Sequence, residues 1–380
     1  MTRVLVASDK FKGSLSSAEV ADAVRLGIQR VRPEVVVDSV LVADGGDGTL
    51  AAAVAAGFEL VRRTATGPTG EPVETGYARR GEVAVVELAD VSGLSRLPGG
   101  VLAPMTATSR GTGDLIAAAV DAGCTQIILG IGGSACTDGG AGLVRALGAR
   151  LSDATGADLP EGGAALIAAA SLDLSPLRQR LAGVEIVVAC DVDNPLTGPT
   201  GAAATYGPQK GAPPSLVKQL DAALTHWADL VARPAAAADL RDAAGAGAAG
   251  GVGFAAMALL GAEVRPGIEL LLELVGFREQ LLGCELVVTG EGALDEQTLR
   301  GKAVAGVAAV AREVGVPVVA VCGLNRLDDG RAREAGVAAV YALTDLEADV
   351  RKCIAEPAPL LRRLGERIAL TMAGTERGVG

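Results

Sequence analysis

Charged side chains lie beside glycines in several segments of this 380-residue sequence, and the first segment is residues 8–14 (SDKFKGS). Asp9, Lys10 and Lys12 follow a short hydrophobic run and precede a helix that we expect to begin near Ser16. The first N–H groups of a helix have no partner within the helix. An acid and two lysines beside them therefore suit a phosphate or a carboxylate. The alternative is a simple turn with solvated lysines.

Two carboxylates mark the next segment, residues 44–49 (DGGDGT). The intervening glycines let the backbone approach a ligand closely, so Asp44 and Asp47 could hold Mg²⁺ directly or through water. An Asp-Gly-Gly sequence is also a common turn, and by itself it decides little.

Glycines dominate residues 130–140 (GIGGSACTDGG), which follow one predicted strand and precede a helix. This pattern favours a nest of backbone N–H groups around an oxyanion, and the candidates are Gly132, Gly133 and Ser134. The alternative is a purely structural need for left-handed turns, which glycine adopts without steric cost.

Two further loops combine acids, amides and lysines. In residues 190–211 the candidates are Asp191, Asn194, Gln209 and Lys210. In residues 289–302 they are Glu291, Asp295, Gln297, Thr298 and Lys302. Such groups could orient a hydroxyl nucleophile and neutralise the charge of a phosphate.

The composition makes several mechanisms improbable. His226 is the only histidine, and its segment reads as an ordinary amphipathic helix, which disfavours Ser-His-Asp and Cys-His catalysis. Residues 245–250 match GxGxxG but follow a helix-like stretch, and a Walker A sequence is absent. Carboxylates, lysines, hydroxyls and backbone amides remain. They suit phosphoryl transfer by positioning and charge neutralisation with Mg²⁺.

The bulk properties describe the expected partners. A net charge of −11 argues against general binding to nucleic acids or membrane surfaces, because both are anionic. No charge-free apolar stretch of about 18 residues suggests a membrane span. Six scattered cysteines without a CxxC pair suit buried thiols in a reducing compartment. Because the N-terminal apolar run is also short for a signal peptide, we expect a cytoplasmic protein.

The positions of the loops depend on the elements between them. Short β-branched runs predict strands at residues 3–8, 35–42, 83–88, 126–129, 185–190, 284–289, 317–321 and 337–342. Helices are expected between most of them, including one with capping-box spacing from Ser16 to Glu19, one at 114–122 and one at 304–314. The strands are almost continuously hydrophobic, as when helices cover both faces of a mainly parallel sheet. We therefore predict an α/β fold that binds its ligands at the carboxyl ends of the strands.

The strands near both chain ends share glycine- and acid-tipped exits, which favours a discontinuous domain with a middle domain inserted. We predict the first domain at residues 1–65 and 284–380, and the inserted α/β domain at residues 66–283. Two sequential domains are the alternative. Residues 64–77, rich in Gly, Pro and Thr, are predicted to form a hairpin or a crossover.

Seven motifs occur in order along residues 4–342: SDKFKGSLS, ADGGDGT, TSRGTGDLI, GIGGSACTDGG, CDVDNPLTGPTGA with YGPQKGA, GAGAAGG and GEGALDEQTLRGK. The ordered set resembles the bacterial glycerate kinase family of the type that makes 2-phosphoglycerate. This resemblance implies transfer of the γ-phosphoryl group of ATP to D-glycerate with Mg²⁺. It also implies a Rossmann-like, doubly wound domain from both chain ends, with the site in the cleft beside the inserted domain. Asp47 and Asp114 stand where the family pattern often has glutamate, and Cys136 where it often has Thr or Asn.

The family reaction and the available side chains together suggest roles. The candidates for binding the carboxylate of glycerate are Lys12 and the amides of Gly132–Ser134. The first candidate for orienting its hydroxyl is Asp191, and the second is Asp295. For the γ-phosphate the candidates are Lys210 or Lys302, and for Mg²⁺ or its waters Asp44, Asp47 and Glu291. Further substrate- or phosphate-binding candidates are Asp9, Lys10, Asn194, Gln209, Gln297 and Thr298. The expected partners are glycerate and ATP, and we expect no binding to nucleic acid or membrane. Whether the chain forms a homodimer is left undecided.

Three alternatives to this interpretation remain. A nicotinamide-dependent oxidoreductase would need a strand before residues 245–250 and an acid about 20 residues later. A non-catalytic sugar-acid or phosphate-binding protein would bind without turnover. The nearest alternative is a kinase acting on another small hydroxy acid.

Overall fold

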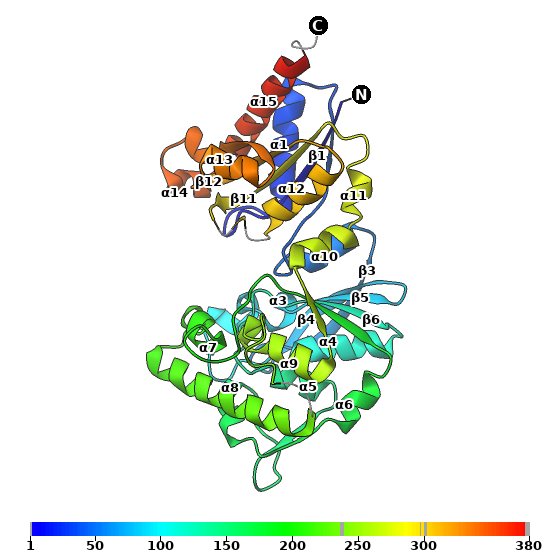
Figure 1. Ribbon diagram of the computed structural model, residues 1–380, viewed down its shortest axis with the longest axis vertical. Coiled ribbons are helices and arrows are strands. Elements are labelled where there is room, and N and C mark those ends of the chain that lie inside the picture. Colours follow the sequence, from blue (N-terminus) through cyan, green and yellow to red (C-terminus); the bar gives the residue numbers. More distant parts are fainter. Residues whose placement is uncertain (1, 236–238, 297, 300–301, 377–380) are drawn as a thin grey trace. The chain divides into compact units, whose positions relative to one another are not determined.

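The computed structural model describes residues 2–235, 239–296, 298–299 and 302–376, and Figure 1 shows it as a ribbon. Two compact units share the chain. We call residues 1–44 together with 268–380 unit 1, and residues 45–267 unit 2. Unit 1 is thus built from both chain ends and unit 2 is one continuous insertion. This confirms the predicted α/β fold with a discontinuous Rossmann-like domain.

The boundaries differ from the predicted ones at 65/66 and 283/284. The chain leaves unit 1 after Asp44 and returns to it at Ile268. The first boundary moves because strand β3 (Glu59–Thr66) pairs with β4 (Pro72–Arg80) in the sheet of unit 2. The second moves because helices α10 (Gly267–Leu274) and α11 (Phe277–Gln280) lie almost wholly in the C-terminal segment of unit 1.

Unit 1 contains a five-stranded parallel sheet in the order β13-β12-β11-β1-β2. Its strands are β1 (Arg3–Ser8), β2 (Val36–Ser39), β11 (Leu286–Leu294), β12 (Val318–Asn325) and β13 (Val337–Ala342). Besides α10 and α11, its helices are α1 (Ser17–Val31), α12 (Ala303–Glu313), α13 (Asp329–Glu334), α14 (Val350–Ala355) and α15 (Pro357–Glu376). The N-terminal strand lies inside the sheet, where Val4 faces Leu286 and Ser8 faces Gly290.

Helices α1 and α15 lie side by side in unit 1, although they come from opposite ends of the chain (Figure 1). Glycine makes this close contact possible. A Cβ atom on Gly27 would lie 2.0 Å from the Arg362 carbonyl oxygen, and one on Gly365 would lie 2.5 Å from that of Val24. Helix α1 begins with the predicted capping box, in which the Ser16 hydroxyl accepts from the Glu19 N–H and the Glu19 carboxylate accepts from the Ser16 N–H.

Unit 2 contains a six-stranded sheet in the order β10-β9-β6-β5-β4-β3, parallel from β10 to β5 and antiparallel beyond. The strands not yet named are β5 (Val83–Glu87), β6 (Gln126–Gly130), β9 (Glu185–Ala189) and β10 (Glu263–Arg265), with a separate hairpin of β7 (Arg150–Ser152) and β8 (Ser171–Asp173). The helices are α2 (Thr49–Ala55), α3 (Ala89–Ser92), α4 (Arg110–Asp121), α5 (Ala141–Ala146), α6 (Ser175–Arg180), α7 (Ala202–Tyr206), α8 (Pro214–Ala235) and α9 (Val252–Leu260).

Residues 64–77 fall within the β3–β4 hairpin, so the first of the two predicted alternatives is correct. The turn between the strands uses Gly70 with a φ of 96°, a value that glycine adopts without strain. Strand β11 continues to Leu294, five residues past its predicted end at residue 289. Glu291 therefore lies within a strand and not in the loop that follows it.

Candidate active site

The carboxyl ends of β1 and β11 bring acidic groups together in unit 1. The Asp9 N–H donates to the Gly290 carbonyl, 2.9 Å away, which ties the loop after β1 to β11. Burial raises the pKa of Asp9 to about 7, and the negative charges of Asp44 and Glu291 add to the effect. Three predicted site residues thus lie within electrostatic reach of one another, because the parallel strands end at the same edge.

Glu291 is the most engaged member of this acidic group. Burial raises its pKa, and the negative charges of Asp295 and Asp44 also act in that direction. A hydrogen bond from the Thr298 hydroxyl and the positive charge of Lys302 act in the opposite direction. The loop after β11 therefore supplies both a hydroxyl donor and a cation to the carboxylate.

The loop after β11 is folded on itself. The Thr298 N–H donates to the Asp295 carbonyl oxygen, and the Asp295 N–H donates to the Thr298 hydroxyl, each over 3.0 Å. Lys10 is half-buried next to Asp9, whereas Lys12 is exposed and its backbone lies close to Gly292. Gln297, also predicted as a site residue, lies outside the described residues.

Carboxylate oxygens are ligands that Mg²⁺ prefers, and the acids around Asp9 repel one another, so a cation would be favoured there. Among the residues that the structure describes, no three His, Cys, Asp or Glu side chains lie close enough to form a ready metal site. Asp47, predicted to act with Asp44 and Glu291, belongs to unit 2.

In unit 2 the glycines of two predicted segments pack backbone against backbone. The Gly132 N–H donates to the Gly45 carbonyl oxygen, 3.1 Å away. A Cβ atom on Gly132 would lie 2.5 Å from the Gly46 Cα, and one on Gly130 would lie 2.7 Å from the Gly45 oxygen. Gly130 and Gly132 are therefore needed because the two loops interlock.

Asp47 is exposed and lies over the other loop. A Cβ atom on Gly133 would come within 2.8 Å of its Oδ1 atom, so the carboxylate lies directly against the Gly133 backbone. Gly133 itself has a φ of 75°. The structure thus brings Asp47, Gly132 and Gly133 together, as the prediction of a strand-end site requires.

Lys210 does not lie where a γ-phosphate could reach it. Its side chain is only 1% exposed, and its ammonium group donates to the Ser134 hydroxyl over 2.8 Å and to the Cys136 carbonyl oxygen. Burial lowers its pKa, while the Cys136 thiol and Asp138 act against that shift. Lys210 holds the glycine-rich loop from the inside, which corrects the role in charge neutralisation that the sequence suggested.

A second buried charge fixes the end of the same loop. The Asp138 carboxylate accepts from the N–H groups of Ser109, Gly140 and Gly142 at 2.8, 3.1 and 3.2 Å. Burial nevertheless raises its pKa. Asp138 was not among the predicted site residues, although an acid inside a glycine-rich run was a signal that could have identified it.

Glu87 is a second residue that sequence analysis missed. It ends β5, opposite Gly130 of β6, and its side chain is 6% exposed. Burial raises its pKa to about 7. A strand-final glutamate after a hydrophobic run was the available signal.

The loop after β9 carries the remaining candidates. Asp191 is exposed, and its Oδ1 atom accepts from the Gly267 N–H over 2.7 Å. The side chain of Asn194 is held within the loop, because its amide donates to the Thr200 carbonyl and its oxygen accepts from the Tyr206 hydroxyl. Gln209 is exposed. Asn194 is thus committed to loop structure, whereas Asp191 and Gln209 face solvent.

Two other features have structural explanations. His226 lies in α8, half-buried, with its Nε2 atom 2.6 Å from the Ala169 carbonyl oxygen. The GxGxxG segment at 245–250 follows no strand. Its Gly247 and Gly250 lie against the carbonyl oxygens of Pro195 and Cys136, where a Cβ atom would be only 2.2 Å away. Tight packing, and not a dinucleotide, accounts for these glycines.

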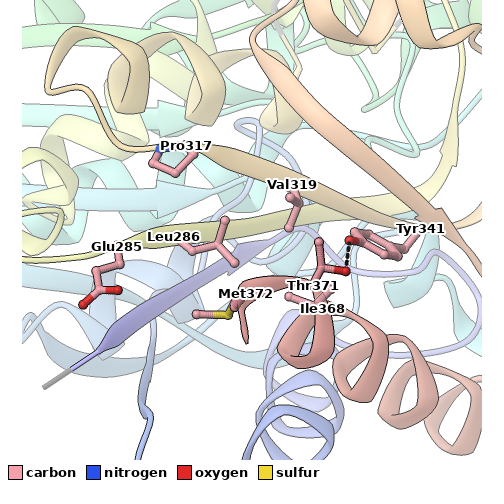
Figure 2. A pocket seen from close by; sticks show the side chains of 8 residues that line it. All are labelled: Glu285, Leu286, Pro317, Val319, Tyr341, Ile368, Thr371 and Met372. Carbon is pink, nitrogen blue, oxygen red and sulfur yellow. Dashed lines mark hydrogen bonds between the residues drawn. The ribbon is translucent and has the colours of Figure 1, made fainter. Parts of the chain in front are cut away.

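A cavity of about 220 Å³ lies elsewhere in unit 1 (Figure 2). It is lined by Glu285, Leu286, Pro317, Val319, Tyr341, Ile368, Thr371 and Met372. The Tyr341 hydroxyl donates to that of Thr371 across 3.3 Å. Glu285 and Pro317 precede β11 and β12, so the cavity lies away from the strand ends that carry Asp9 and Glu291.

Phosphoryl transfer needs positioning and charge stabilisation more than covalent help from the protein. The strand ends of unit 1 carry acids and a lysine, and those of unit 2 carry backbone amides. These groups can supply positioning and charge stabilisation without a P-loop. The fold and these loops indicate an α/β small-molecule kinase.

Comparisons with known proteins agree with this class. The family model described as the glycerate kinase family matches residues 4–373, and the chain belongs to that family. It is 42% identical to "Glycerate 2-kinase" of Escherichia coli (strain K12), with all of both chains covered. It is 41% identical to "Glycerate kinase" of Bacillus subtilis (strain 168), with 97% of each covered. A crystal structure assigned to glycerate kinase 2 from Salmonella typhimurium LT2 superposes with a TM-score of 0.82 at 41% identity, covering 99% of both chains.

Membership of a kinase family implies ATP as the phosphoryl donor and a small molecule as the acceptor. Within the described residues, no helix is both long and apolar enough to cross a membrane.

Proposed function

We propose that this chain is a glycerate 2-kinase, which transfers the γ-phosphoryl group of ATP to the 2-hydroxyl of D-glycerate and releases ADP and 2-phosphoglycerate. The observation that carries the choice of hydroxyl is the full-length similarity to a protein named glycerate 2-kinase. The acidic and glycine-rich strand ends support the reaction class, because they supply charge and backbone donors at the ligand-binding edge of each sheet.

We further propose that the reaction uses Mg²⁺ and that Asp44 and Glu291 hold it or its waters in unit 1. Carboxylate oxygens suit this ion. A cation bound nearby would favour the ionised forms of Asp9 and Glu291 and so lower their raised pKa values. Asp47 belongs to unit 2 and is a separate candidate for the ion. When bound, the ion supplies charge neutralisation on the phosphates.

Lys302 is our candidate for the γ-phosphate, in place of the buried Lys210. It is half-buried in the loop after β11, where its charge is felt by Glu291. Lys10 and Asp9 lie at the same strand ends and are proposed to contact phosphate oxygens or their water shell, whereas Thr298 is buried and its hydroxyl donates to Glu291. Lys12, which is exposed, is our candidate in unit 1 for binding the substrate carboxylate, and the amides of residues 132–134 are the separate candidate in unit 2.

Asp191 is our candidate for orienting the hydroxyl that attacks. One of its oxygens is fixed by the Gly267 N–H, which sets the direction of the carboxylate while its side chain is exposed. Asp295 is the second candidate. Its backbone contacts with Thr298 hold the loop that also carries Lys302.

The test is a coupled ADP-release assay with ATP, Mg²⁺ and D-glycerate, followed by phosphorus NMR of the product. We expect glycerate-dependent ADP release and 2-phosphoglycerate. Formation of 3-phosphoglycerate would support kinase activity but contradict phosphorylation at the 2-hydroxyl. Turnover with a different hydroxy acid alone would reject the substrate, and binding without ATP consumption would favour a sugar-acid binding protein.

The role of Asp191 has a matched control in the same loop. Asp191→Asn is expected to lower kcat by about 100-fold or more, because a positioned carboxylate contributes roughly that much to proton transfer. Asp193 is exposed as well and is not a site candidate, so Asp193→Asn should remain within about threefold of the wild type. Equal activity of the two variants would remove Asp191 from the mechanism.

We also propose a cytoplasmic location for this kinase, with a homodimer as one of two oligomeric states to be tested. All six cysteines are free thiols, which supports a reducing compartment. Sedimentation of the purified protein, with and without nucleotide, decides between a monomer and a dimer.

A further inference from the structure

We propose that Glu87 is a positioning residue for the Gly45–Gly48 turn and, through it, for Asp47. This inference rests on the proposed function, since it assigns a further part to the site on unit 2. Glu87 differs from the acids of unit 1 because its carboxylate is turned inward, toward backbone N–H groups.

A single oxygen of Glu87 carries the contact. Its Oε2 atom accepts from the Leu50 N–H over 2.8 Å and from the Gly48 N–H over 3.2 Å. Both donors belong to the first turn of α2 or to the residue just before it. Glu87 comes from the end of β5, so the contact joins a strand of the sheet to a loop far away in the sequence.

The turn needs such a partner because it cannot cap its own helix. Gly48 stands at the N-cap of α2 with a φ of 102° and has no side chain to accept from the helix N–H groups. On the other side, the Thr49 hydroxyl donates to the Gly46 carbonyl oxygen over 2.7 Å. Residues 46–50 are thereby held from two directions, and Asp47 projects from between them.

Burial of this carboxylate is costly, which argues that it has a function. A carboxyl group removed from water is destabilising unless hydrogen bonds compensate for the lost hydration. Burial accordingly favours the protonated form of Glu87, as do the negative charges of Asp47 and Asp90, while the two N–H donors favour the ionised form. An apolar residue would pack at this place without that cost but could not hold the turn.

The contact matters for the site because of what the turn touches. Gly45 and Gly46 interlock with Gly130 and Gly132, and the Asp47 carboxylate lies against Gly133. A displaced turn would therefore move Asp47 and the glycine-rich loop together. Displacements of about 1 Å can lower turnover by about 100-fold when they alter the alignment of reacting groups.

The test compares Glu87→Gln with Glu87→Asp in the full-length protein. Glutamine keeps an oxygen at the same reach and loses the charge, whereas aspartate keeps the charge and withdraws the oxygen by one methylene group. We expect Glu87→Gln to keep kcat within about threefold of the wild type, and Glu87→Asp to lose about tenfold or more. Glu82 lies exposed just before β5, and Glu82→Gln should leave kcat unchanged.

A second measurement does not depend on catalysis. Amide hydrogen exchange at Gly48 and Leu50 is expected to accelerate by about tenfold or more in Glu87→Asp and to stay near the wild-type rate in Glu87→Gln. A Gln variant as inactive as the Asp variant would overturn the inference, because the charge and not the hydrogen bonds would then be needed. Unchanged exchange in both variants would overturn it as well. Absence of glycerate kinase activity in the wild type would instead refute the proposed function, and exchange would still decide the role of Glu87.

Discussion

The strand ends of the two units are built on different principles. In unit 1 they carry half-buried charged side chains, and the negative charge of Asp44 helps to raise the pKa values of Asp9 and Glu291. In unit 2 they consist of backbone in close contact, with glycine at the points of contact and the buried Lys210 holding the loop from inside. Exchange of these charged side chains in unit 1 is therefore expected to disturb the backbone little, although Gly290 and Gly323 there also lie against backbone carbonyl oxygens. In unit 2 one added or removed group displaces the loops.

The largest effect on stability is expected from Lys210→Met. The change leaves the Ser134 hydroxyl and the Cys136 carbonyl without their buried donor and removes the positive charge near Asp138. Loss of one member of a buried polar group costs about 3 kcal/mol of unfolding free energy. Urea unfolding measures it, with Lys218→Met on an exposed face of α8 as the control. Equal midpoints for both variants would contradict the buried role.

Gly132→Ala tests the interlocked backbones directly. The new methyl group would lie 2.5 Å from the Gly46 Cα, so the two loops must separate, at a cost of about 2 kcal/mol. The matched change in unit 1 is Gly292→Ala, whose Cβ atom would have its nearest neighbour at 3.6 Å. We expect that variant to stay within about 0.5 kcal/mol of the wild type in the same unfolding experiment. Equal losses would erase the contrast between the units.

Asp9→Asn is expected to increase stability at alkaline pH in metal-free protein. The pKa of Asp9 is raised to about 7 in the folded state, so its contribution to stability is complete in acid and is lost as the pH rises through that value. Relative to the wild type, the variant should therefore gain about 1–2 kcal/mol between pH 6 and pH 8. Unfolding curves across this range with a chelator present measure the gain. A gain that does not change with pH would show that Asp9 does not titrate in this range.

The smallest of these effects is expected away from both loops. Ser16→Ala removes the hydroxyl that caps α1 and should cost about 1 kcal/mol, without a change in KM for glycerate or ATP. A change in KM would mean that the start of α1 affects the position of the loop carrying Asp9. The difference between the units would then involve more than their strand ends.

Much of the fold followed from local patterns. The structure has the hydrophobic strands of both sheets and the Ser16 cap near their predicted positions. Hydrophobic patterns and helix caps depend on residues that are neighbours in the chain, so the sequence alone reveals them. The first unit boundary was misplaced because β3 has an exposed, polar pattern and forms a strand only by pairing with β4. Short strands such as β10 likewise depend on a partner that the local sequence does not reveal.

The candidate site was predictable as a pool of residues but not as a set of roles. Asp9, Asp44 and Glu291 were found because acids at strand ends stand out from hydrophobic runs. Lys210 has the same signal as a phosphate-binding lysine, glycine on its C-terminal side and a loop around it, yet it points into the protein. Only burial and hydrogen-bond partners separate these two cases, and neither is written in the local sequence.

The position of β1 inside its sheet has a consequence for synthesis of the chain. Its neighbour β2 follows directly in the chain, but its other neighbour β11 is made only after all of unit 2, so one edge of β1 waits for its partner. We expect unit 2, a continuous segment, to become protease-resistant first in ribosome-arrested chains that stop before β11, while residues 1–44 remain cleavable. Protection of residues 1–44 in such chains would contradict this order. A hydrophobic strand that must wait is also the segment most exposed to aggregation during translation.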